Sequence, residues 1–396
     1  HGHSLTEFVW FRYGKFAYLL VLSIMVFYLF VFLSAEMGAI ARAVELITEV
    51  PLFVTLILVG GSTVAYTAYG GLRTSIFTDN IQFILIFPLM FVILVATLIE
   101  LGGWGSAFDS VKSVNPDLLK LNHQPGIELG LTLMIGILAA NLFHQGFWQR
   151  VYSAKSVDDV RKGFLTSGLI VIPLIVLAGF FGLWAIGQGV SSAFDPIALF
   201  RLALEILPGS VMLALMALAL ILVMSSMDTL LNGIASIFTT DLSRLGTFQD
   251  KNKLLRSSRL ITIATILPAM LVGLIFDSVL YLFLIADLVC AAAVTPVFIG
   301  LYVRRFTGKM VGTSTVLGIL SGAVFFPTKT LSGWWTFPEL TEFWHILASG
   351  NTLASFMIAV IISSSVSVAF AVFARYSGKT QPYDFDELSS RISLLN

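Results

Sequence analysis

Long apolar runs alternate with short polar segments along most of the chain. A run of about 20 apolar residues is enough for a helix to cross the roughly 30 Å of hydrocarbon in a bilayer. In hydrocarbon each backbone polar group needs a partner inside its own segment or a closed barrel, and none of these runs alternates as barrel strands do. The pattern therefore predicts an all-α, polytopic membrane bundle of about ten helices. The predicted spans are 15–47, 51–70, 77–102, 127–148, 163–189, 209–240, 257–275, 278–303, 309–327 and 351–375.

Composition supports a membrane protein. Hydrophobic residues make up 57% of the 396 residues and charged residues only 12%, about half the usual charged fraction of a globular domain, and the mean hydropathy is +0.92. Lys and Arg together number 23, as do Asp and Glu, so the charge balance gives no reason to expect a nucleic-acid partner. The single cysteine, Cys290, cannot form a disulfide within the chain.

The basic residues predict an orientation. Of the 23 Lys and Arg residues, 18 fall in connecting segments on one side of the bundle, which marks that side as cytoplasmic; the exceptions are Arg42, Lys112, Lys120, Arg201 and Lys329. Both ends of this chain are then expected in the cytoplasm, in a plasma or bacterial inner membrane. The outer segments 103–126 and 190–208 are candidates for short lid helices. Because the chain opens at His1 without a Met or a signal pattern, we expect it to be N-terminally truncated.

Polar residues recur along one face of the span 209–240. Ser225, Thr229, Asn232, Ser236 and Thr240 follow one another at helical spacing, with Asp228 beside them. Such hydroxyls can join helices, at about 0.6 kcal/mol each. A carboxylate near a bilayer centre costs about 2.5–3.5 kcal/mol, and joining helices does not easily explain it. The pattern favours a site for a small hard cation or a proton.

A second polar group lies near the end of the span 127–148. Asn141 and Gln145 are four residues apart and are expected to share a helix face, with His144 beside them. Amide and imidazole groups there could bind a polar solute, or they could be satisfied within the bundle. Asp79 follows Thr78 in the first turn of the predicted span 77–102, where an acidic side chain could cap the helix.

Two further acids, Glu36 and Asp287, stand in apolar surroundings. Each could be a coupling carboxylate or the partner of Arg42 or of another polar side chain, and the sequence does not decide between these roles. Nucleotide-binding and metalloenzyme motifs such as GxxxxGK[ST] and HExxH do not occur. The sequence therefore predicts a carrier driven by an ion gradient and not an enzyme.

Three stretches carry a resemblance to a known family. "YGGLRTSIFTDNIQ", "GFWQRVYSAKS" and "SSMDTLLNGIASIFTTDL" resemble signature stretches of the sodium/solute symporter family, and the similarity runs from Leu5 to about Arg305. It implies a LeuT-type fold of two inverted five-helix repeats. The first three spans would be core helices three to five, and the next five would be core helices six to ten. Core helices one and two would be missing, and two extra helices would follow.

The resemblance also implies roles for the site residues. It places sodium-binding hydroxyls on Ser225 and Ser226. A second sodium site, present in some members, maps to Asp79, Asp228 and Thr229, and Asp228 replaces a serine of some relatives, which leaves a proton or a second cation open. Asn141, His144 and Gln145 align with a substrate-facing segment. The following segment, "FLTSGLIVIPLIV", is more apolar than in sugar carriers, which favours an amino acid or a urea-like compound.

These inferences make the expected protein a sodium-coupled symporter of a small polar solute. The transmembrane symporter domain is expected over residues 1–376, with core helices at about 15–303, extra helices at about 309–375 and a cytoplasmic tail at 377–396. Its expected partners are sodium, the solute and the lipid bilayer, with no nucleic acid and no obligate protein partner. A transporter-like sensor module and a proton-coupled carrier of the same fold are the alternatives.

Overall fold

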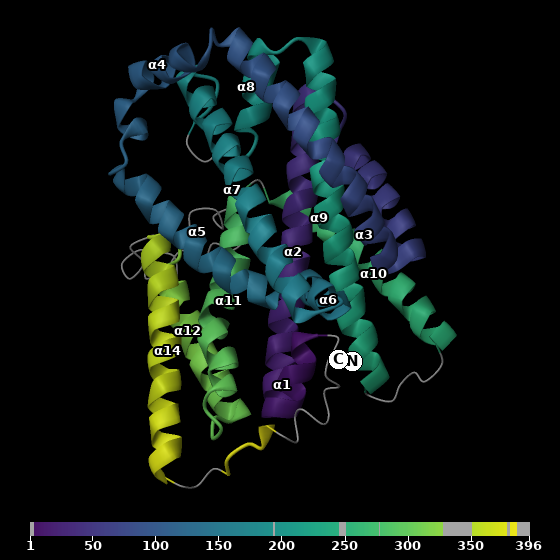
Figure 1. Ribbon diagram of the computed structural model, residues 1–396, viewed down its shortest axis with the longest axis vertical. Coiled ribbons are helices and arrows are strands. Elements are labelled where there is room, and N and C mark those ends of the chain that lie inside the picture. Colours follow the sequence, from purple (N-terminus) through teal and green to yellow (C-terminus); the bar gives the residue numbers. More distant parts are fainter. Residues whose placement is uncertain are drawn as a thin grey trace. The chain divides into compact units, whose positions relative to one another are not determined.

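The computed structural model describes residues 4–192, 195–244, 251–276, 278–327, 351–377 and 381–385. Within these ranges the chain is mainly helical (Figure 1), and no β-strand is assigned to them. Most of the predicted tail therefore lies outside the described residues. The helices are α1 (Leu5–Tyr13), α2 (Lys15–Thr48), α3 (Leu52–Glu100), α4 (Trp104–Val114), η1 (Pro116–Leu119), α5 (Gln124–Phe143), α6 (Gln145–Ser153), α7 (Val157–Gly187), α8 (Ala198–Ile206), α9 (Gly209–Arg244), α10 (Lys251–Ile275), α11 (Val279–Phe298), η2 (Ile299–Leu301), α12 (Gly308–Phe325) and α14 (Thr352–Ser377).

Nine helices of the described residues are long and apolar enough to cross a membrane. They account for all ten predicted spans, because α3 contains the second and the third. Gly71 interrupts α3 with φ 57° and ψ −149°, a conformation that is open to glycine and strained for other residues. The spans 51–70 and 77–102 are thus the two arms of one broken helix.

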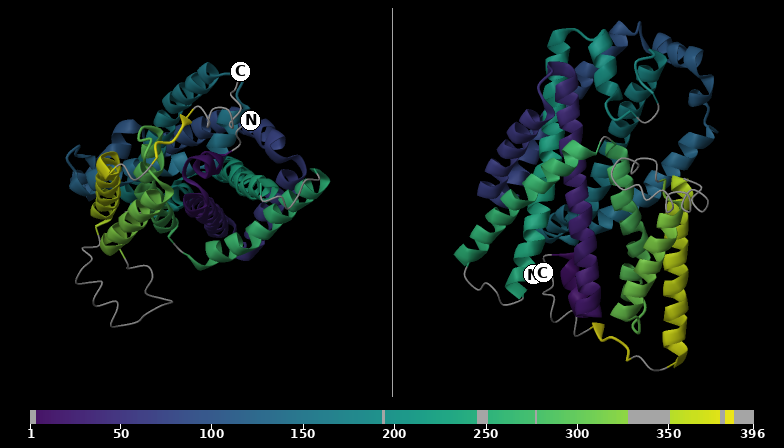
Figure 2. Two further views of the ribbon diagram at one scale, coloured as in Figure 1. Left: turned by 90° about the horizontal axis from the view of Figure 1, so that it is seen from below. Right: turned by 180° about the vertical axis from the view of Figure 1, so that it is seen from behind.

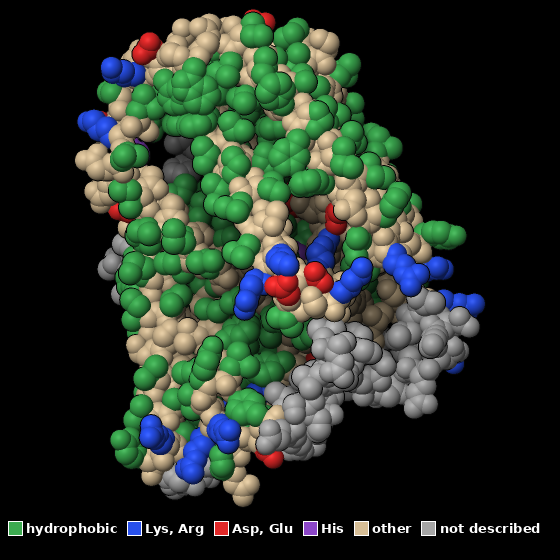
Figure 3. Space-filling model, in the orientation of Figure 1, with side chains coloured by type: hydrophobic (Ala, Val, Ile, Leu, Met, Phe, Trp, Pro, Cys, Tyr) green, Lys and Arg blue, Asp and Glu red, His purple; other side chains and the backbone are tan. Residues whose placement is uncertain are grey.

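Exposed side chains of the long helices are predominantly apolar, as Figure 3 shows for one face. On α7, Phe164, Leu165, Leu169, Ile172 and Ile175 are each at least half exposed. A face of this kind would be unfavourable in water and is the one that lipid requires. The prediction of an all-α, multi-spanning membrane bundle is confirmed.

The chain divides into two compact units. The first unit comprises His1–Val31, Gln124–Ser153 and Tyr281–Asn396, and the second comprises Phe32–His123 and Ala154–Leu280. The predicted boundaries of the symporter domain and of its tail stay predictions.

In the first unit, α12 packs along α14 through small residues (Figures 1 and 2). A Cβ at Gly318 would lie 2.7 Å from the Cβ of Ser363, and one at Gly322 would lie 2.7 Å from the Cβ of Ala359. The Ser355 hydroxyl donates to the Gly322 carbonyl at 2.7 Å. Close approach of small residues is the usual means by which helices associate in lipid.

Arg12 and Tyr13 attach α1 to the end of α11 and to the segment after it. The Arg12 side chain is 5% exposed and donates to the carbonyls of Gly300, Val303 and Phe306 at 2.7–3.1 Å. The Tyr13 hydroxyl donates to the Val297 carbonyl at 2.7 Å. These bonds satisfy carbonyls that a helix end leaves without intrahelical partners.

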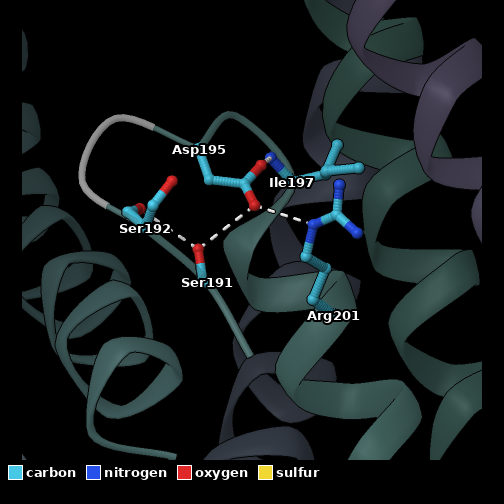
Figure 4. Close-up of polar contacts among 5 residues, drawn as sticks. All are labelled: Ser191, Ser192, Asp195, Ile197 and Arg201. Carbon is cyan, nitrogen blue, oxygen red and sulfur yellow. Dashed lines mark hydrogen bonds and ion pairs between the residues drawn. The ribbon is translucent and has the colours of Figure 1, made fainter. Parts of the chain in front are cut away.

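In the second unit, α9 runs alongside α3 and α10 (Figures 1 and 2). The predicted short helices are present as α4 and α8, and both pack against α7. Figure 4 shows how the start of α8 is held: the Asp195 carboxylate accepts hydrogen bonds from Ser191 Oγ at 3.1 Å, the backbone N–H of Ile197 at 3.0 Å and Arg201 Nε at 2.7 Å. One partly buried carboxylate therefore stabilises the turn before α8 and pairs with a charge on that helix.

Candidate functional site

The carboxylate of Asp228, on α9, is fully buried and surrounded by hydroxyl groups. Ser75 Oγ donates to Oδ1 at 2.8 Å and Thr229 Oγ1 to the same oxygen at 3.2 Å. Tyr66 OH and Thr78 Oγ1 each lie 3.2 Å from Oδ2, and each proton is shared with a backbone carbonyl, that of Met224 at 3.1 Å and that of Thr74 at 2.9 Å. Four hydroxyl donors around one carboxylate stabilise its negative charge in a place where water does not reach it.

The break at Gly71 explains how α3 reaches Asp228 from two directions. Tyr66 lies on the arm before the break, whereas Ser75 and Thr78 lie after it and share a face because they are three residues apart. Tyr66 and Ser75 are nine residues apart, so an unbroken helix would separate them by more than two turns along its axis. The backbone conformation of Gly71 is therefore part of the construction of this site.

Asp79 joins the same group. Ser225 Oγ donates to Asp79 Oδ1 at 2.6 Å, and Asp79 also lies within electrostatic range of Asp228. The expected capping role of Asp79 is wrong, because the helical arm begins directly after Gly71 and Asp79 lies beyond its first turn. Its carboxylate is directed at α9.

Ser226 faces a different acid. Its hydroxyl donates to the Leu222 carbonyl of its own helix at 3.2 Å, and Glu36 of α2 lies within hydrogen-bonding reach of it. Arg42, a predicted partner of Glu36, donates to the Phe276 carbonyl. We use the name acid–hydroxyl cluster for Tyr66, Ser75, Thr78, Asp79, Ser225, Asp228 and Thr229, with Glu36 and Ser226 beside it.

The acid–hydroxyl cluster has the donor chemistry of a hard cation site. All of its ligating atoms are carboxylate or hydroxyl oxygens, which suit hard ions and not soft transition metals. No group of three or more His, Cys, Asp or Glu side chains in the described part of the chain could hold a metal ion. The same bonds also fasten α9 to α3, so the interpretation as a joint between helices accounts for part of the pattern. Sodium binding by Asp79, Ser225, Ser226, Asp228 and Thr229 stays a prediction.

The second predicted group lies at a break between two helices of the first unit. The predicted span 127–148 is not one helix: α5 ends at Phe143 and α6 begins at Gln145. His144 lies between them, and its Nδ1 accepts the backbone N–H of Gly146 at 3.1 Å. Its ring lies 5.8 Å from the ring of Tyr28 and 4.8 Å from that of Phe147.

This break changes how the three polar residues are presented. His144 and Gln145 are buried, at 7% and 0% exposure, whereas Asn141 is exposed. The expected shared face of Asn141 and Gln145 is therefore absent, because the α-helical phase does not continue through His144. Non-helical backbone at membrane depth is tolerated where it is covered by protein or lines a water-filled cavity. Solute binding by Asn141, His144 and Gln145 stays a prediction.

Sequence reasoning missed three of the hydroxyl donors to Asp228, namely Tyr66, Ser75 and Thr78. A signal for two of them was present, since Ser75 and Thr78 are spaced to share a face beside the acid Asp79. Tyr66 stands on the far side of a glycine pair, and no local pattern connects it to a residue more than 150 positions away.

The chain is similar in sequence to proteins of a known transporter family. A model of the sodium:solute symporter family matches residues 3–318. A spermidine transporter of Candida albicans is 27% identical, over 96% of this chain and 73% of that protein. A sodium/glucose cotransporter of Vibrio parahaemolyticus is 25% identical, over 82% of this chain and 65% of that protein. A sodium/myo-inositol cotransporter of Mus musculus is 24% identical, over 61% of this chain and 40% of that protein.

A solved structure has a similar fold. It shows a Na⁺-coupled sialic acid symporter in a substrate-bound, outward-open state, with a TM-score of 0.73 and 18% sequence identity. The match covers 96% of this chain and 78% of the solved one. At this identity the match concerns the fold, and it confirms the LeuT-type architecture that the sequence motifs implied.

Proposed function

The chain belongs to the sodium:solute symporter family, and we propose that the protein couples sodium entry to the symport of a small polar organic solute by alternating access. The single observation that carries the proposal is the buried Asp228 carboxylate with hydroxyl groups from α3 and α9 on both of its oxygens. The coupling ion of the family is sodium, and an oxygen cluster of this kind suits it.

The acid–hydroxyl cluster would hold α3 and α9 together more strongly when a cation is bound. Asp79 and Asp228 repel each other when both are ionised, and a cation between α3 and α9 would offset that repulsion. Hydroxyl groups that now donate to carboxylates also have lone pairs with which to ligate a cation. Sodium would then favour the conformation in which α3 and α9 lie together. If that conformation also binds the solute more tightly, sodium and solute increase each other's affinity by the same factor.

For the solute we propose a small nitrogen-containing compound, such as an amino acid, a urea-like compound or an amine. The relative that aligns over the largest share of the chain among those named above carries the name of an amine, spermidine. Relatives named for glucose and myo-inositol align over smaller shares.

The test is uptake by the complete natural protein in proteoliposomes. A panel of labelled amines, amino acids, urea and sugars is supplied with an inward sodium gradient, and then with potassium in place of sodium. Sodium-driven accumulation of at least one solute is the expected result. Equal uptake of every solute with and without the gradient would overturn the proposal. We also propose that the connecting segments rich in Lys and Arg face the cytoplasm, which labelling of single introduced cysteines from either side would check.

A further inference from the structure

Asp287 of α11 is a buried acid without a hydrogen-bond partner among the described residues. Its side chain is 5% exposed, and within the described residues it makes no hydrogen bond and no ion pair. Asp228, by comparison, has four hydroxyl groups within hydrogen-bonding distance of its carboxylate. A carboxylate at membrane depth that serves only packing is costly, and such acids as a rule mark a substrate or ion pathway.

The surroundings of Asp287 are apolar and aromatic. A Cβ built on Gly136 of α5 would lie 3.1 Å from Asp287 Oδ2 and 2.9 Å from a ring carbon of Phe356 on α14. The hydroxyl of Tyr28, on α2, lies within electrostatic range of the carboxylate. All of these residues belong to the first unit. The result is a carboxylate beside Tyr and Phe side chains, where α5 approaches so closely that a glycine is the residue that fits at position 136.

This chemistry discriminates among cations. A sodium ion needs several oxygen ligands, and here the described residues provide one carboxylate without a ring of hydroxyls. An alkylammonium group needs less, since a carboxylate accepts its N–H donors and aromatic faces attract its charge. We propose that Asp287 binds the ammonium group of the transported solute, and that the solute is an organic compound with such a group. This inference rests on the proposed function and narrows its substrate class.

The residues around Asp287 connect it to the predicted solute segment. Tyr28 lies within electrostatic range of Asp287, and its ring is also 5.8 Å from that of His144, so one aromatic residue adjoins both. Neither α5 nor α11 contains a Lys or Arg, so an ammonium group meets no repelling charge on these two helices. Arg150 of α6 lies within electrostatic range of His144 and could pair with a carboxylate, so an amino acid fits as well as a simple amine.

The experiment measures equilibrium binding of labelled spermidine and putrescine to the complete purified protein in sodium, with glucose, urea and a neutral amino acid as competitors. Asp287→Asn keeps the side-chain volume and removes the charge, and it is expected to weaken amine binding about tenfold or more. Asp287→Glu keeps the charge and should retain measurable binding. Glu128→Gln, on the partly exposed first part of α5, is the matched control and should bind as the wild type does.

The outcomes separate this inference from the proposed function. Sodium-driven uptake only of solutes that lack an ammonium group, or unchanged amine binding by Asp287→Asn, would overturn the role of Asp287 while the symport proposal stands. Absence of any sodium-driven uptake defeats the symport proposal first. If Asp287→Asn does not accumulate, Gly136→Ala decides: it leaves the charge in place but puts a methyl group 3.1 Å from Oδ2, and it should weaken amine binding. Wild-type binding by Gly136→Ala would then count as refutation.

Discussion

The Ser225 hydroxyl donates a hydrogen bond of 2.6 Å to the Asp79 carboxylate and so joins α9 to α3. The two residues are 146 positions apart in the sequence. The bond adjoins a second connection between the same helices, in which Ser75 and Thr78 donate to Asp228. Both connections use oxygen atoms suited to sodium. Sodium binding would therefore be thermodynamically linked to the packing of α3 against α9.

Removing the Ser225 hydroxyl tests this linkage. Ser225→Ala is expected to raise the sodium concentration for half-maximal uptake by roughly tenfold, since one oxygen ligand and the orientation of Asp79 are both lost. Ser226→Ala should also weaken sodium dependence, as the family resemblance implies. The measurement is the sodium dependence of uptake at a fixed solute concentration, and Ser113→Ala, in the exposed part of α4, is the control. Unchanged sodium activation in both variants would contradict the assignment.

Asp228 should matter for both folding and ion binding. In Asp228→Asn the amide nitrogen cannot accept a hydrogen bond, so the hydroxyl groups on one side of the side chain lose an acceptor. Tyr66 and Thr78 keep backbone carbonyl acceptors, and the expected cost is about 1 kcal/mol of stability. Loss of the charge should also abolish most sodium-induced stabilisation. Thermal unfolding in sodium and in potassium measures both effects. Asp158→Asn, whose carboxylate pairs with Lys162 on the exposed part of α7, should show the full sodium-induced shift.

The positions of the helices could be predicted well from the sequence, but their breaks could not. Apolar runs predict spans because hydrocarbon imposes a length and an internal hydrogen-bond pattern on every crossing segment. The sequence separated the spans 51–70 and 77–102 at the polar segment 71–76, but it did not indicate that α3 would continue through that segment. It also did not indicate that α5 would end at Phe143. Glycine permits a positive φ, but tertiary contacts decide whether it is used.

The candidate site was predictable on one helix only. Helical spacing brought Ser225, Asp228 and Thr229 together because they stand on the same element. The partners of Asp228 on α3 and the approach of Glu36 to Ser226 depend on which helices pack together. Spacing within a segment carries no information about such pairs, and for that reason Glu36 and Asp287 had no assigned role before the structure.

Gly71 offers a test of the break in α3. Its φ of 57° with ψ of −149° lies in a region that side chains with a Cβ strongly disfavour, so Gly71→Ala should cost about 1–3 kcal/mol of stability or straighten the helix. Straightening would separate Tyr66 from Ser75, and sodium-driven uptake should then fall. Gly61→Ala, on the same helix with open space at its Cβ position, is the matched control. Equal uptake and stability in the two variants would show that the break is not needed.

Tyr13 gives a prediction outside the membrane-spanning segments. Burial raises its pKa to about 12, above the ordinary 10, so the folded state holds the phenol proton more tightly than the unfolded state does. The associated stability is therefore fully present below pH 10 and is lost as the pH rises from 10 through 12. An alkaline titration followed by tyrosinate absorbance should show one tyrosine fewer titrating near pH 12 in Tyr13→Phe than in the wild type.

The substitution Tyr13→Phe should also lower stability at neutral pH. It removes the hydrogen bond to the Val297 carbonyl, which should cost about 0.5–1.5 kcal/mol. It leaves the ring packed beside Arg12. Tyr376→Phe, at a side chain that is 85% exposed, is the control and should leave stability at neutral pH unchanged. If instead Tyr13→Phe removed a group that titrates near pH 10, Tyr13 would be accessible to water, and the attachment of α1 to the end of α11 would be weaker than the buried hydrogen bonds indicate.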